Sequence, residues 1–191
     1  PTVFTMNATY YTNNQGILSP MNNTRAFKKL DGENNREITT IVTDHPQYGP
    51  NTEIDMIAFY DYNTLITNIP SQRICNEGYF EDNLNLGQLI ATLQDPSAGL
   101  ATYLPEVTTT EWSNGPFHTF QSSLNTSIGV ISQTLYFSQA DGVLSFAVND
   151  SHPSIVAETL NGLVATTITD DDFKHAHCRC RSFLGASETI E

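Results

Sequence analysis

Two short stretches near the end of the chain carry the side chains best suited to metal chemistry. The first has alternating imidazole and thiol donors at His175, His177, Cys178 and Cys180, and these are donors that zinc prefers. A structural zinc site normally draws ligands from two separated segments, and the only other cysteine is Cys75. A covalent bridge is therefore the simpler use of Cys75.

The second stretch is the acidic run Asp170, Asp171 and Asp172. Its carboxylate oxygens are ligands that calcium accepts in flexible geometry. The run lacks the spacing and the glycine of an EF-hand loop, and an acidic run is ordinarily a solvated turn. From the residues alone, both a calcium site and a plain turn remain open.

No spacing in the sequence indicates catalysis. Glu53 and Asp55 share one face of an expected strand, but no nucleophile or base accompanies them, and His45, His118 and His152 lie beside proline or aromatic residues. The sequence contains neither a Gly-x-Ser-x-Gly elbow nor a His-Glu-x-x-His helix. We therefore expect a protein that is not an enzyme.

Length and charge limit the remaining classes of protein. A chain of 191 residues suits a single domain over residues 1–191, and such a domain buries roughly 70% of its unfolded surface. The net charge of -13 opposes binding to nucleic acid or to anionic lipid surfaces. Because no apolar run of about 18 residues and no leader-like segment is present, we expect neither a transmembrane segment nor a retained signal peptide.

The strongest structural pattern is a buried β-hairpin over residues 54–75. Its first strand carries apolar side chains on both faces, with Ile54, Met56, Ala58 and Tyr60 on one and Ile57 and Phe59 on the other. The turn comes at 61–63, and the second strand ends at Pro70. A strand of this kind needs cover on both sides.

Most of the remaining chain is extended in character. Residues rich in Thr, Val, Ile, Tyr and Phe predict strands over 1–12, 38–43, 101–112, 117–123 and 128–137. Asp141-Gly142 predicts a hairpin turn between 135–137 and 143–148. Apolar spacing predicts one helix over 86–93, with Asn83 or Asn85 as N-cap, and a second short helix near 154–160, while 13–35 and 44–51 have loop composition. The fold class is therefore mostly β with one or two short helices.

Secretion is suggested by sequons and cysteines together. Glycosylation sequons begin at Asn7, Asn22, Asn125 and Asn149, but a chain so rich in Asn, Ser and Thr would hold about three by chance. Cys178 and Cys180 lie far along the chain from Cys75, which suits a staple that holds the tail against the sheet. One cysteine is left over, either as a free thiol or as a link to another chain.

Three segments resemble the ependymin-related family. They are the hairpin that ends in Cys75, the triplet Glu111-Trp112-Ser113 after a long strand, and the segment 168–173 ahead of Cys178. The likeness covers about residues 36–178 and leaves 1–35 as an N-terminal strand and loop and 179–191 as a tail. Further cysteine pairs of the vertebrate members are missing, and the family's Gly-Ile-Lys-Asp-Pro run appears only as 165–170.

The resemblance implies two stacked antiparallel sheets, a half-open sandwich or barrel similar to bacterial lipoprotein carriers, around a hydrophobic pocket. It also implies a Cys75–Cys178 bridge, secretion, use of sequons and often calcium, for which Asp170, Asp171 and Asp172 are the candidate ligands. Some marine-invertebrate members are similar blue proteins that hold carotenoids. An acidic, Asn-rich chain is compatible with that group.

Aromatic side chains from the expected strands are the candidate ligand-binding residues, although strand aromatics are ordinarily core. They are Phe59, Tyr60, Tyr62, Tyr103, Trp112, Phe117, Phe120, Tyr136, Phe137 and Phe146. We therefore expect a secreted carrier of a long apolar molecule, either a lipid or a carotenoid. The alternative is an extracellular, calcium-dependent adhesion or matrix protein. A homodimer, or a heterodimer with a homologous chain, is expected to cover strands that are apolar on both faces.

Overall fold

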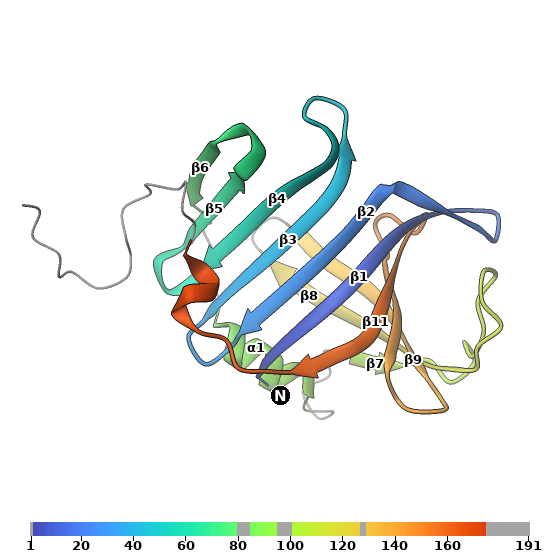
Figure 1. Ribbon diagram of the computed structural model, residues 1–191. Helices are drawn as coiled ribbons and strands as arrows, with labels where there is room; N and C mark the ends of the chain where they lie inside the picture. Colours follow the sequence, from blue (N-terminus) through green and yellow to red (C-terminus); the bar gives the residue numbers. More distant parts are fainter. Residues whose placement is uncertain (1, 80–84, 95–100, 127–128, 175–191) are drawn as a thin grey trace, which may run out of the picture.

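A single, strongly curved antiparallel sheet forms most of the molecule (Figure 1). The computed structural model describes residues 2–79, 85–94, 101–126 and 129–174. The strands are β1 (Val3–Asn14), β2 (Ile17–Asp31), β3 (Arg36–His45), β4 (Gly49–Phe59), β5 (Thr64–Ile69), β6 (Ile74–Tyr79), β7 (Ala101–Tyr103), β8 (Phe117–Thr126), β9 (Gly129–Ser138), β10 (Leu144–Asn149) and β11 (Ile155–Ala165). The helical elements are α1 (Leu86–Gln94) and the 3-10 turns η1 (Tyr60–Tyr62), η2 (Pro70–Gln72) and η4 (Asp170–Phe173).

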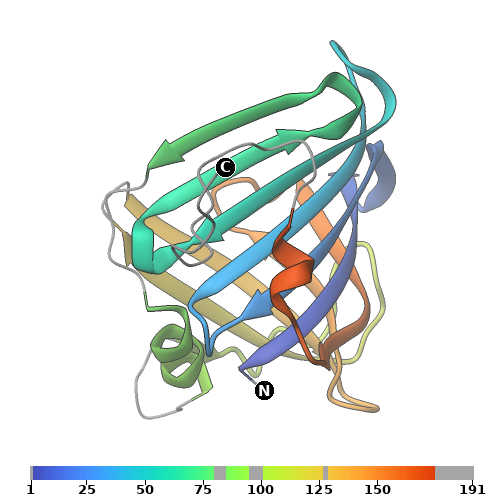
Figure 2. The ribbon, with the colours of Figure 1, turned by 60° about the vertical axis from the view of Figure 1, so that its left-hand side comes forward.

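The strand order explains how one sheet makes two layers. The order is β6-β5-β4-β3-β2-β1-β11-β10-β9-β8-β7, so the chain's first and last strands are neighbours in the middle of the sheet. The arm that holds β2 to β6 faces the arm that holds β7 to β10 (Figures 1 and 2). The prediction of a mostly-β fold is confirmed, and the two facing layers belong to one continuous sheet.

Irregular pairing bends the middle of this sheet. The register shifts between Met6 and Asn7 where β1 pairs with β11, between Thr9 and Tyr11 where β1 pairs with β2, and between Leu144 and Phe146 where β10 pairs with β9. Bulges of this kind bend a strand and increase its twist. Because they lie in and beside the two middle strands, they fold one arm of the sheet over the other.

The strongest sequence patterns correspond to real elements. Strands β4 and β5 form a hairpin whose turn is η1. The turn ends at Asn63, whose φ of 50° lies in the left-handed region that asparagine tolerates. The Asp141-Gly142 turn joins β9 to β10 as predicted. Helix α1 begins at Leu86, and the Asn85 side chain accepts a hydrogen bond from the Gln88 amide at 2.8 Å, as an N-cap does.

Four sequence predictions were wrong, at least in part. The loop predicted over 44–51 is a turn at 46–48 only, since β3 extends to His45 and β4 begins at Gly49. Residues 13–35 are mostly the strand β2 rather than a loop, because Pro20 and the positive-φ residues Asn22 and Asn23 lie at an irregularity inside a long strand. Residues 154–160 belong to β11 rather than to a helix, since β1 and β10 pair with both edges of that segment. The strand predicted over 101–112 ends at Tyr103, just before Leu104 and Pro105.

The two faces of the curved sheet are packed differently. We call the face that contacts η4 the outer face and the face that contacts α1 the inner face (Figure 1). Side chains alternate between them, so Ile57 lies on the outer face and its neighbour Met56 on the inner face. Two of the three buried clusters are on the outer face, one around Ile57 beneath Phe173 of η4, the other around Phe117.

Candidate functional site

The inner face carries apolar side chains that the described residues only partly cover. Its half-buried members are Met6, Tyr10, Ile41, Ile54, Met56, Phe120, Leu135 and Phe137. Leu163 and Tyr103 on the same face are 45% and 46% exposed. The outer face also exposes apolar residues, Leu160 and Val164, but on β3 and β4 its residues Ile38 and Ile57 are 6% and 0% exposed. The inner face therefore has apolar surface that the described residues leave uncovered.

One ion pair interrupts this apolar surface. Lys28 of β2 and Glu37 of β3 lie 3.0 Å apart, and Lys28 pairs across the strands with Met6 and Thr39. The Tyr60 hydroxyl bonds the Glu37 carboxylate, and burial together with that carboxylate raises the pKa of Tyr60. Apart from this pair, the described strands carry no Lys, Arg, Asp or Glu side chain on the inner face.

An aromatic group lies on the inner face of the opposite arm. The ring of Phe120 contacts Tyr103 at 5.2 Å and Phe137 at 5.7 Å between centroids, the second pair edge to face. Tyr103 also contacts the His118 ring at 6.1 Å. These rings come from β7, β8 and β9, so the arm that faces Lys28 is lined by aromatic rather than charged groups.

Helix α1 is held against one end of the inner face by backbone and side-chain contacts. The Asn35 side chain accepts a hydrogen bond from the Leu86 amide at 2.6 Å. Gly32 and Gly87 approach so closely that a Cβ on Gly87 would lie 2.6 Å from the Gly32 carbonyl oxygen. Apolar contacts then join Leu86 and Ile90 to Phe4, Leu30 and Tyr60. The helix therefore covers the end of the sheet where the β2–β3 turn lies.

The structure separates the aromatic residues predicted to bind ligand. Tyr103, Phe120 and Phe137 share the inner face, and Tyr60 packs against the α1 cluster. Trp112, Phe117, Tyr136 and Phe146 belong to the cluster around Phe117 on the outer face, and Phe59 packs against the cluster around Ile57. Tyr62 is 55% exposed in η1. The ten residues therefore do not form one wall.

Sequence reasoning missed the residues that make the inner face distinctive. These are Met6, Lys28, Glu37, Ile41, Ile54 and Met56. Alternation in 54–59 did separate the two faces of that strand. It could not tell which face would be inside the curve, because that depends on the strand order and the bulges.

The acidic run of η4 is paired with bases. Asp170 bonds Arg36 at 2.7 Å, Asp171 bonds Lys174 at 2.6 Å and Asp172 bonds Lys29 at 2.5 Å. Hydrogen bonds from Lys29 and from the Thr169 amide lower the pKa of Asp172 to about 2. Among the described residues, no group of three or more His, Cys, Asp or Glu side chains is arranged to hold a metal ion. Calcium binding at this run stays a prediction, without support from this geometry.

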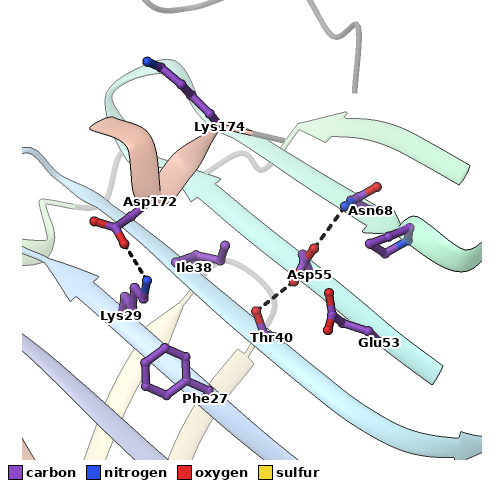
Figure 3. Close-up of a pocket in the computed structure, with 10 residues that line it drawn as sticks. Phe27, Lys29, Ile38, Thr40, Glu53, Asp55, Asn68, Asp172 and Lys174 are labelled. Atoms are coloured by element: carbon purple, nitrogen blue, oxygen red, sulfur yellow. Dashed lines mark hydrogen bonds and ion pairs between the residues drawn. The ribbon is translucent and has the colours of Figure 1, made fainter. Parts of the chain in front are cut away.

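A polar pocket of about 300 Å³ lies on the outer face beside η4 (Figure 3). Asp55 accepts hydrogen bonds in it from Thr40 at 2.7 Å and from Asn68 at 3.0 Å. The full lining is Phe27, Lys29, Ile38, Thr40, Glu53, Asp55, Asn68, Pro70, Asp172 and Lys174. Five of these ten side chains are charged, so this pocket does not suit a long apolar molecule.

Of the residues predicted to form a disulfide or a zinc site, the structure describes only Cys75. Cys75 of β6 pairs in register with Asn68 and is disulfide-bonded. Its predicted partner Cys178 lies outside the described residues, as do Cys180 and the zinc candidates His175 and His177, so the pairing stays a prediction.

The sequons are distributed over several strands. Asn7, Asn22 and Asn149 are exposed, whereas the side chain of Asn125 lies outside the described part. Exposure is what glycosylation requires, but the use of each sequon stays a prediction.

Comparison with protein-family models found no match for this chain, and comparison with curated proteins found none either. The likeness to ependymin-related proteins therefore stays a prediction. In the part of the chain that the structure describes, none of the helices has the length and hydropathy of a membrane span.

Proposed function

We propose that this protein is a secreted, non-enzymatic carrier that binds a long apolar molecule, a lipid or a carotenoid, against the inner face of its sheet. One observation carries the proposal: on β3 and β4 the inner-face side chains of Ile41, Ile54 and Met56 are only half-buried, while Ile38 and Ile57 on the outer face of the same two strands are buried. Apolar side chains that face a neighbouring arm without being covered by it indicate a binding surface.

The chemistry of the inner face suits a flexible hydrocarbon chain. Burial of apolar surface contributes roughly 25 cal/mol per Å² to binding. Met6 and Met56 pack at the level of Lys28, and methionine side chains adapt to ligands of irregular shape. The rings of Phe120 and Phe137 on the opposite arm provide flat contact surfaces. Helix α1 covers one end of the surface and gives a bound chain a fixed limit there.

Two measurements test this proposal. Protein purified from its own source would be extracted with organic solvent and the extract analysed by mass spectrometry and visible absorption. We expect a stoichiometric apolar compound, and visible absorption if that compound is a carotenoid. A clean extract from the natural protein argues against a carrier.

Binding to the neutral hydrocarbon probe diphenylhexatriene would locate the surface. Met56→Gln places a polar amide on the inner face, and we expect it to weaken binding about tenfold, since burial of an unpaired polar group costs about 1–3 kcal/mol. Phe27→Gln is the matched control, because Phe27 is 37% exposed on the outer face. Equal losses in both variants would place the probe elsewhere.

A further inference from the structure

We propose that the inner face selects long-chain carboxylates, with the Lys28 ammonium receiving the carboxylate and Glu37 and Tyr60 positioning Lys28. This inference rests on the proposed function and adds the chemical class of the ligand. It starts from the placement of one ion pair on a surface that is otherwise without formal charge in the described strands.

The Lys28 ammonium has donors to spare. An ammonium carries three N–H groups, and within the described residues its hydrogen-bond partner is the Glu37 carboxylate oxygen at 3.0 Å. The Tyr60 hydroxyl bonds the same carboxylate. Glu37 is therefore held between two donors and fixes the position of Lys28, while N–H groups of the ammonium remain for a ligand.

The side chains of Lys28 and Glu37 keep 28% and 18% of their surface exposed, so the pair is accessible to solvent. A pure hydrocarbon laid over the pair would exclude solvent from it and supply no hydrogen-bond acceptor, and an unpaired buried donor is costly. A carboxylate end group replaces the water with a charge-assisted hydrogen bond, which is stronger than a neutral one. The pair therefore discriminates against ligands without a polar end.

The register also fixes the direction of the bound chain. Glu37 lies in the same row as Leu30 and Ala58, and Leu30 contacts α1. Lys28 lies in the next inner-face row, with Thr39 and Met56, further from that helix. Beyond it on the inner face lie Ala26, Ile41 and Ile54 in the next row. A carboxylate on Lys28 would therefore sit at the α1 end, with its hydrocarbon running over Ile41 and Ile54.

The test compares three 18-carbon ligands that differ in their end groups. Oleate, methyl oleate and 1-octadecene would each displace diphenylhexatriene from wild-type protein, from Lys28→Met and from Lys29→Met, at a pH at which oleate is ionised. Lys29 is the matched control, because it is the adjacent lysine and its side chain pairs with Asp172 on the outer face. We expect Lys28→Met to weaken oleate binding about tenfold or more and to leave 1-octadecene unchanged. Lys29→Met should change neither.

A second variant guards against a folding defect in the first. Glu37→Gln keeps the size and an acceptor for Tyr60 but removes the negative charge beside Lys28. We expect it to tighten oleate binding several-fold, which a general loss of structure would not do. Equal weakening of all three ligands by Lys28→Met, or wild-type affinity for oleate no higher than for methyl oleate, would overturn the carboxylate assignment alone. Failure of all three ligands and the probe to bind wild-type protein would overturn the carrier proposal itself.

Discussion

The two faces of one sheet show that an apolar pattern does not by itself identify a core. Met56 and Ile57 are consecutive apolar residues of β4, yet Ile57 is 0% exposed beneath η4, while Met56 stays half-buried on the inner face. The difference lies in what covers each face. The turn η4 and the segment 104–116 cover parts of the outer face. The inner face instead faces the opposite arm of the curved sheet (Figure 2).

The distribution of charge repeats this contrast. On the outer face, charged residues such as Lys29, Glu53 and Asp55 line a polar pocket. On the inner face, the described strands hold one pair, Lys28 and Glu37. The inner face, which is nearly without charge and is half-buried at Met56, is the one we propose as the binding surface, because ligand pockets are lined mainly by apolar side chains.

The largest expected effect concerns Arg36, which forms a buried ion pair with Asp31 and also holds η4 through Asp170 and Phe173. Arg36 bonds Asp31 at 2.9 Å, with side chains 8% and 2% exposed, and its guanidinium lies 4.3 Å from the centre of the Phe173 ring. Arg36→Met would leave the Asp31 carboxylate buried without its cation, so we expect a loss of about 3–5 kcal/mol in the free energy of unfolding. Urea denaturation would measure it. Lys174→Met, at the exposed end of η4, should not change the free energy of unfolding measurably. Equal effects of the two variants would show that the buried Arg36 contributes no more to stability than the exposed Lys174.

A smaller effect is expected from the pair of residues that defines the comparison. Ile57→Ala should lower the free energy of unfolding by about 3 kcal/mol, since truncation of a fully buried isoleucine leaves a cavity. Met56→Ala should cost less than about 1.5 kcal/mol, because Met56 is only half-buried. Binding of diphenylhexatriene should show the opposite order, with the larger loss for Met56→Ala. If Met56→Ala proves as destabilising as Ile57→Ala, the inner face is core and not a binding surface.

The smallest expected effect is a dependence on acid. Hydrogen bonds from Lys29 and Thr169 lower the pKa of Asp172 to about 2, below the ordinary value of about 3.9 for an aspartate. The folded state therefore gains stability from this carboxylate above about pH 4, and that gain disappears as the pH falls through about 2. Chemical denaturation of wild type and Asp172→Asn between pH 2 and pH 6 would measure it. The two stability curves should approach each other at the acid end, and a constant separation would contradict the assignment.

Local patterns predicted those elements that are stabilised locally. The β4–β5 hairpin, the Asp141-Gly142 turn and helix α1 were found because turn residues and an N-cap mark their ends. Strands β2 and β11 were missed for a different reason. Asn22 and Asn23 in β2 have positive φ and lie at an irregularity within a long paired strand, where the composition predicted a loop. Residues 154–160 were predicted as a helix from local spacing, but pairing with β1 and β10 makes them part of β11.

The candidate site depends on features that no local pattern contains. Lys28 and Lys29 are neighbours of one type, and only the pairing of β2 with β3 shows that one meets Glu37 inside the curve while the other faces Asp172 outside it. The aromatic residues were chosen by type, and the register then divided them between the faces. Side-chain alternation could be predicted from the sequence. The sense of the sheet's curvature could not.

Asn35 bonds more than the first amide of α1. Its backbone oxygen accepts from the Tyr60 amide at 3.0 Å, and its side-chain amide donates to Asp61 at 2.5 Å. One residue in the β2–β3 turn thus joins the helix to η1, where β4 turns toward β5. Loss of the Asn35 side chain would therefore remove one hydrogen bond from the start of the helix and one from the hairpin turn at the same time.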